Sequence, residues 1–183
     1  MIPPTALDVA RRCLCLELLH HRLLLEEAED AQSERERARV AWMGRHDALG
    51  VTAALLDDER VLLAAPVGAL DGDGLDDLHG RATGAVVLLW ALGRLDARPT
   101  FRTVETMEKV LADHGLLGDG SVSRAKAAAE AASLRDQAER DVAHDAYLRS
   151  RGKAKDVDDP ERIFAEVAAH HLGWVAGDEE LER

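Results

Sequence analysis

The sequence predicts an all-α fold, a compact irregular bundle of six or seven helices, and three observations lead to this prediction. Hydrophobic residues make up 46% of the 183 residues and aromatic residues only 3%, so leucine, alanine and valine must build the core. Such residues favour closely packed helices, since strands prefer aromatic and β-branched side chains. Apolar residues also recur at helical spacing, and no stretch shows the alternation of a half-buried strand. We expect one helical domain over residues 1–183, in which segment 121–150 can be peripheral.

Four segments begin with an N-terminal helix signal, in which a side-chain oxygen or an acidic first turn complements the free amides of the first turn. The signals lie at Thr5, Ser33, Asp57 and Asp159. They predict helices over about residues 5–31, 33–45, 57–66 and 159–177. In the last of these, Pro160 directly follows the capping residue, which is the preferred place for proline in a helix.

The other helices are predicted from apolar runs between glycines. Residues 84–92 carry no charge but are too few to span a bilayer, so we expect a central buried helix over 75–92. It should follow a turn at 71–74. A short helix is expected over 103–113, and a long alanine-rich helix over 121–150 whose small side chains from Ala125 to Val142 could receive a neighbouring helix. Flexible connections are expected at 118–120 and 151–158.

The predicted core centres on the helix at 75–92. We expect five side chains to be largely buried there: Trp90, Leu89, Val86, Leu18 and Trp174.

The charge limits the classes of partner. The chain has 35 acidic and 23 basic residues, a formal net charge of −12, which argues against nucleic-acid binding because phosphates require a concentrated cationic face. Attraction over distance would favour a basic protein partner. The two cysteines, Cys13 and Cys15, point to different sides of one predicted helix and cannot form a disulfide within it. With no secretory signal or membrane span in the sequence, we expect a cytoplasmic protein.

No spacing indicates a metal ion or a cofactor. A calcium loop beginning at Asp71 would need an oxygen ligand at its fifth position and an acid at its twelfth, where the chain has Leu75 and Ala82. The histidine pairs at 20–21 and 170–171 are adjacent, and neighbours on a helix do not face each other. We therefore expect neither a structural metal nor a tightly bound cofactor.

Nucleophile and phosphate-loop motifs are missing from the sequence. An enzyme would need polar residues that converge from separate helices. The candidates for such a site are Glu17, His20, Arg81 and His170.

One aromatic residue and its basic surroundings are candidates for an interaction surface. Trp42 lies on a predicted helix whose face carries Arg35 and Arg39, and an exposed tryptophan there could be an interface hot spot. The alternative is that Trp42 packs in the core between helices.

The run Leu88-Leu89-Trp90-Ala91-Leu92-Gly93 resembles a box found in the bacterial family called domain of unknown function 4272. Weaker similarities extend over most of the chain, at Arg12 to Glu27, Trp42 to Glu59, Leu134-Arg135 and Ala169 to Gly177. The family pattern Trp-Arg-x-Glu before the box is only partly kept, because Gly80 and Thr83 flank Arg81 in its place. The resemblance implies an all-helical fold and no known activity.

These observations predict a cytosolic protein-interaction module rather than a catalyst. Its form would be an accessory or adaptor subunit of a bacterial assembly, or an immunity-type inhibitor that covers a basic toxin by electrostatic steering. The alternative is an enzyme with a polar site between helices.

Overall fold

A computed structural model describes residues 2–117, 121–152, 156 and 158–178. Within these ranges the chain forms nine α-helices and one 3-10 helix, η1, without a strand, which confirms the all-α prediction. The elements are α1 (Ala6–Glu27), α2 (Gln32–Leu49), η1 (Thr52–Ala54), α3 (Asp57–Ala64), α4 (Gly72–Ala91), α5 (Phe101–Val104), α6 (Met107–His114), α7 (Val122–Glu130), α8 (Gln137–Arg151) and α9 (Pro160–Ala176).

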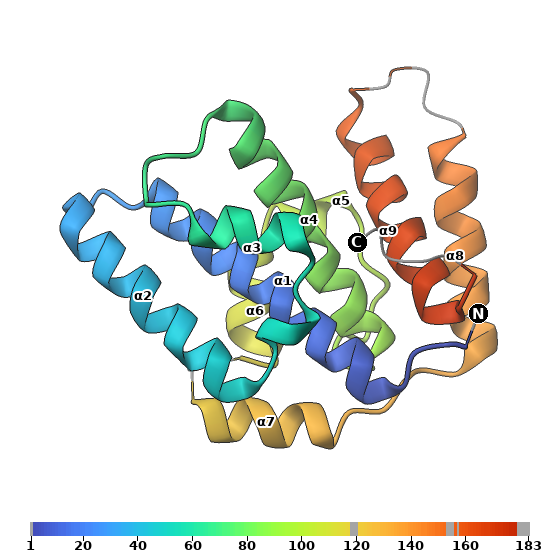
Figure 1. Ribbon diagram of the computed structural model, residues 1–183. Helices are drawn as coiled ribbons and strands as arrows, with labels where there is room; N and C mark the ends of the chain where they lie inside the picture. The colour runs from blue at the N-terminus through green and yellow to red at the C-terminus, as the bar shows by residue number, and fades with distance from the viewer. Residues whose placement is uncertain (1, 118–120, 153–155, 157, 179–183) are drawn as a thin grey trace.

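The helices surround a central pair formed by α1 and α4. Figure 1 shows α2, α1, α4, α9 and α8 following one another from left to right, and neighbours in this series are in contact. Helix α3 packs on α1, α5 and α6 pack on α4, and α7 lies across α1 and α2 at the lower end. The core therefore lies around α1 and α4, whose middle portions are buried on nearly every side.

The predicted core side chains lie largely where they were expected. Leu89 and Val86 are fully buried, and Leu18 and Trp90 are 2% exposed. Trp174 differs, because it is only partly buried and packs at the edge of the core.

All four predicted helix starts lie within one residue of a helix in the structure, but only two of the four signal residues are the N-cap. Thr5 and Asp8 form a reciprocal capping box at α1, and the Asp159 side chain accepts from the Glu161 amide at α9. Ser33 instead lies inside α2, which begins at Gln32, and its box partner Glu36 bonds Arg39. Asp57 begins α3 with the acidic first turn that the sequence predicts, but the N-cap is Leu56.

Other boundaries also differ. Helix α1 ends at Glu27 rather than near residue 31. The expected turn at 71–74 is the start of α4, because the Asp71 carboxylate accepts from the Gly74 amide and caps the helix. The expected connections at 118–120, 153–155 and 157 lie outside the described residues.

The predicted helix over 121–150 is two helices, α7 and α8, because a tertiary contact interrupts it. The Arg135 amide donates to the Ala91 carbonyl at 2.8 Å, and its guanidinium donates to the Trp90 carbonyl at 2.8 Å and lies over the Trp90 ring. These bonds satisfy the free carbonyls at the end of α4. The alanine stripe is divided as a result, and the buried Ala125 belongs to α7, which packs on α1 and α2.

The predicted helix over 103–113 is also two, α5 and α6. The Thr106 hydroxyl donates to the Arg102 and Thr103 carbonyls, and Thr106 itself leaves helical geometry with φ −119° and ψ 20°. Such local bonds compete with helix propagation. The two interruptions account for nine helices where the sequence predicts six or seven.

No α-helix among the described residues combines the length and the apolarity needed to cross a membrane.

Candidate functional site

The candidate site is a cavity of about 490 Å³ at the junction of four helices, α1, α3, α4 and α9. A volume of this size is in the range of small-ligand sites. Most of its lining residues are charged residues or histidines, and they come from segments far apart in the sequence. The lining residues are Arg12, Leu56, Asp58, Asp76, Asp77, Gly80, Arg81, Glu166, Val167, His170 and His171.

A buried ion pair lies at the α1–α3 side of this cavity. Both terminal nitrogens of Arg12 donate to the two carboxylate oxygens of Glu59, each at 2.6 Å. Glu59 is fully buried, and its carboxylate also accepts from the Leu56 amide at 2.9 Å, which caps α3. A bidentate arginine–carboxylate pair is a strong interaction, and removing one partner would leave an unpaired buried charge.

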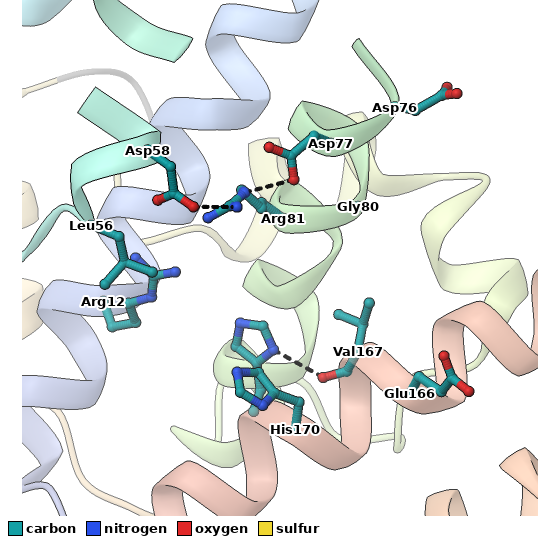
Figure 2. Close-up of a pocket in the computed structure, with 11 residues that line it drawn as sticks. Arg12, Leu56, Asp58, Asp76, Asp77, Gly80, Arg81, Glu166, Val167 and His170 are labelled. Carbon is teal, nitrogen blue, oxygen red and sulfur yellow. Dashed lines mark hydrogen bonds and ion pairs between the residues drawn. The ribbon is translucent and has the colours of Figure 1, made fainter. Parts of the chain in front are cut away.

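Arg81 of α4 joins three carboxylates at the mouth of the cavity. Its guanidinium donates to Asp58 at 2.5 Å and to Asp77 at 2.8 Å, and Figure 2 shows it lying between these two side chains. A third carboxylate, Glu59, lies 3.8 Å from Nη1. Burial lowers the pKa of Arg81, but the hydrogen bonds with Asp77 and Asp58 raise it by more, so its charge is firmly held.

His171 of α9 is a neutral side chain in the wall. Its Nδ1 donates to the Val167 carbonyl at 2.9 Å, so Nε2 carries the lone pair, and Nε2 has no hydrogen-bond partner. Burial lowers the pKa of His171 to about 3. The imidazole lies against Gly84 of α4, where an added Cβ would lie 2.3 Å from Nε2. A glycine at position 84 is therefore required for α9 to pack on α4 in this arrangement.

The lining is acidic overall. It holds two arginines and four carboxylates, and both arginines already have carboxylate partners. Asp76 makes no side-chain hydrogen bond or ion pair within the described parts of the chain, and Glu166 is paired with Arg162 at 3.2 Å. In Figure 2, Asp76 and Glu166 lie on the right side of the view, apart from Asp58 and Arg81. The cavity therefore favours a cationic group over an anionic one.

Of the four residues predicted for an enzymatic site, the structure brings two together. Arg81 and His170 line the cavity, and Glu17 and His20 do not. The Glu17 carboxylate is buried and accepts from the Leu116 and Leu117 amides at 2.7 and 2.8 Å. Burial raises the pKa of Glu17 to about 6. Through these two hydrogen bonds, Glu17 connects the segment after α6 to α1.

His20 lies in the core on α1, 5% exposed, and neither ring nitrogen has a hydrogen-bond partner. Burial lowers the pKa of His20 to about 4, with a smaller contribution from the charge of His79. The imidazole is therefore neutral and packs as a core side chain.

The three residues predicted for an interaction surface all hold α2 in place. Arg35 donates to the Leu25 and Glu26 carbonyls near the end of α1, and Arg39 donates to the Leu63 carbonyl at the end of α3. Trp42 is partly buried, stacked on His21 of α1 with ring centroids 4.1 Å apart.

Local signals in the sequence do not identify Arg12 and His171 as lining residues, or Glu59 as the buried partner of Arg12 directly behind the lining. One signal could have identified Arg12, because a charge within an apolar helical run requires a buried partner. The identity of that partner, 47 residues away, is not contained in local spacing.

Within the described ranges, no three or more histidine, cysteine, aspartate or glutamate residues are placed to hold a metal ion. Cys13 and Cys15 are buried and free, and burial raises the pKa of both thiols, that of Cys15 to about 12. The Cys13 thiol lies within hydrogen-bond distance of the Glu17 carboxylate and the Ala85 carbonyl, and the Cys15 thiol donates to the Val51 carbonyl.

Comparison of the chain with protein-family models, with curated proteins and with solved structures found no match. The family resemblance in the sequence therefore stays a prediction.

Proposed function

We propose that this protein is an interaction module that binds a basic protein partner, and that the acidic cavity receives a lysine or arginine side chain of that partner. The observation that carries the proposal is the charge at the mouth of the cavity. Four carboxylates come from three helices, and the two arginines beside them are already paired.

The arrangement of these charges supports a cation as the occupant. Asp58 and Asp77 share one guanidinium, so each keeps acceptor capacity, since a carboxylate can accept about four hydrogen bonds. Asp76 is free to accept from a further donor. A guanidinium or ammonium group that enters here would exchange its bound water for charge-assisted hydrogen bonds with the carboxylates. Such bonds are stronger than hydrogen bonds between neutral groups.

The net charge of −12 supports the same partner at longer range. A complementary charge on the partner would raise the association rate, and salt would weaken that effect. The specific forms that we propose are an accessory or adaptor subunit of a bacterial assembly, or an inhibitor that covers a basic toxin. The two free, buried cysteines are compatible with the reducing cytoplasm, where we place the protein.

A pull-down with matched variants tests the proposal. The wild-type protein is used as bait in lysate at about 0.1 M and about 1 M salt, where charges are screened over about 10 Å and 3 Å. The cavity variant is Asp76→Asn/Glu166→Gln, and the control is Glu108→Gln/Asp113→Asn on α6, which changes the net charge equally. Both pairs of residues lie at the surface, so the fold should be kept.

We expect a stoichiometric partner that wild type and control retain at low salt, and that the cavity variant loses. Identification of the partner should give a basic protein. Equal capture by all three baits would contradict the proposal, and so would recovery of no partner. The enzymatic alternative, with Arg81 and His170 in the cavity, would then be preferred.

A further inference from the structure

A second cavity, of about 530 Å³, lies between α5, α8 and α9 and has a different composition. Its lining also includes the loop that precedes α5. The lining residues are Arg98, Pro99, Thr100, Phe101, Arg102, Tyr147, Ser150, Asp159, Glu161, Arg162, Phe164 and Ala165. In Figure 1, α9 and α8 lie to the right of α4.

Two arginines at this cavity are not neutralised. Neither Arg98 nor Arg102 forms an ion pair with any described residue, although acidic residues outnumber basic ones by 35 to 23 in the chain. The third, Arg162, is paired with Glu166 through Nε at 3.2 Å. The chain as a whole is acidic, so two guanidinium groups without an ion-pair partner make the surface at this cavity locally positive.

The two carboxylates in the lining offset this charge only in part. Asp159 is engaged as the N-cap of α9, where its Oδ1 accepts from the Glu161 amide at 2.9 Å and its charge is favourable to the helix dipole. Glu161 is exposed in the first turn of α9, which also favours a negative charge there. Neither carboxylate forms an ion pair with Arg98 or Arg102.

Aromatic side chains give the cavity a firm wall. The Tyr147 hydroxyl donates to the Pro99 carbonyl at 2.7 Å, and its ring meets the Phe164 ring edge to face at 5.7 Å. The Arg98 guanidinium lies over the Tyr147 ring, 5.1 Å from its centroid, which keeps this cation at the cavity without a carboxylate. Phe101 completes the aromatic lining and is partly buried.

The geometry points to a binding site in this second cavity for a small organic anion, a phosphate or carboxylate group carried on a flat ring. Arg98 and Arg102 bind the anionic group, because guanidinium groups match the bidentate geometry of phosphate and carboxylate. The ring of the ligand lies against Phe101, which is partly exposed. Tyr147 and Phe164 are each only 5% exposed, and they support Arg98 and the wall from behind. Thr100 and Ser150 supply hydroxyl groups for additional polar contacts. The inference does not rest on the proposed basic partner, although the Arg162–Glu166 ion pair joins the linings of the two cavities.

Titration with three defined probes tests the site. Phenyl phosphate carries both the anion and the ring, inorganic phosphate carries only the anion, and phenol carries only the ring. Binding is measured at low salt by calorimetry and by amide chemical shifts in an NMR spectrum. We expect saturable binding of phenyl phosphate, weaker binding of the other two, and shifts at residues 98–102 and 159–165.

Arg98→Ala/Arg102→Ala should weaken binding of phenyl phosphate by about tenfold or more, because two charge-assisted contacts are lost. The matched control is Arg37→Ala/Arg45→Ala on α2, which removes the same charge and includes Arg45, an arginine that also lies over an aromatic ring. The single variant Arg102→Glu, at an exposed position, repeats the test if the double variant does not fold.

Three results would overturn the inference. The first is no saturable binding of phenyl phosphate to the wild type. The second is equal weakening in the control, which would indicate an effect of net charge alone. The third is shifts confined to residues away from this cavity.

Discussion

The two cavities differ in how their charges are satisfied. At the acidic cavity, Arg12 is paired with a fully buried carboxylate and Arg81 is held between Asp58 and Asp77. At the second cavity, Arg98 lies over an aromatic ring, and neither Arg98 nor Arg102 has a carboxylate partner among the described residues. The first set of charges therefore contributes to the assembly of four helices, whereas two of the three arginines at the second cavity are not part of an ion pair in the described part of the chain.

This difference separates stability from binding. A charge that is buried and paired cannot be changed without a large cost in the folded state. An exposed charge can be removed with little change in the free energy of unfolding. Where such a charge contacts a ligand, its removal weakens binding instead. Variants at the two cavities should therefore fall into two groups. Two predictions examine the acidic cavity, and a third extends the same reasoning to buried titratable groups in its wall and elsewhere in the core.

The largest effect is expected for Glu59→Ala. It leaves Arg12 buried without a partner and should lower the free energy of unfolding by about 3–5 kcal/mol in a urea denaturation experiment. The double variant Arg12→Met/Glu59→Leu should recover most of this loss, because it removes both charges. Asp76→Ala, at the same cavity but exposed, should change stability by less than about 0.5 kcal/mol. An effect of Glu59→Ala as small as that of Asp76→Ala would contradict the view that the buried, paired charges stabilise the fold.

A smaller effect is expected for Gly84→Ala. The added Cβ would lie 2.3 Å from Nε2 of His171, so α9 must shift and the free energy of unfolding should fall by about 1–3 kcal/mol. Gly80 is one turn earlier on the same helix and lines the same cavity, but a Cβ there meets no atom within 4 Å. Gly80→Ala should stabilise the protein by up to about 1 kcal/mol. Equal effects of the two variants would show that the α4–α9 contact is loose.

The third prediction, with the smallest expected effect, concerns how the free energy of unfolding changes with pH. Burial lowers the pKa of His171 from 6.5 to about 3 and that of His20 to about 4. As the pH falls below 6.5, the unfolded chain binds protons that the folded chain does not, so stability should decrease. Glu17 opposes this between pH 4.5 and about 6, because its raised pKa lets the folded chain bind the proton first.

Two histidines outweigh one glutamate, so stability should decline from pH 6.5 toward pH 4. Denaturation at several pH values measures the slope, to which each histidine contributes at most about 1.4 kcal/mol per pH unit. His171→Gln should reduce the slope, and His114→Gln, at an exposed position, should leave it unchanged. An unchanged slope in His171→Gln would show that this imidazole can be protonated in the folded state.

Local signals in the sequence predicted the fold class and most helix positions. The capping box at Thr5 and the Asp159-Pro160 start are local, since donor and acceptor lie within three residues, and both appear in the structure. The break before α8 was not predictable in this way. It depends on Arg135, whose partners at Ala91 and Trp90 lie more than 40 residues away.

The same limit applies to the candidate site. Arg81 and His170 were predicted from the sequence as parts of one polar site, and both line the same cavity. The sequence did not predict the residues that surround them there. Arg12 and Glu59 form a bidentate ion pair at the site although 47 residues separate them in the chain. This ion pair depends on how α1 packs against α3, and the spacing of apolar residues within each helix does not predict that packing.

The bonds of Arg135 have a consequence for the way the protein opens. Because this residue holds the last carbonyls of α4, the end of the central helix cannot fray while the connection between α7 and α8 stays docked. The two segments therefore belong to one cooperative unit, although about 45 residues separate them in the chain. Amide hydrogen exchange at the end of α4 should follow the opening of the peripheral connection rather than that of its own helix.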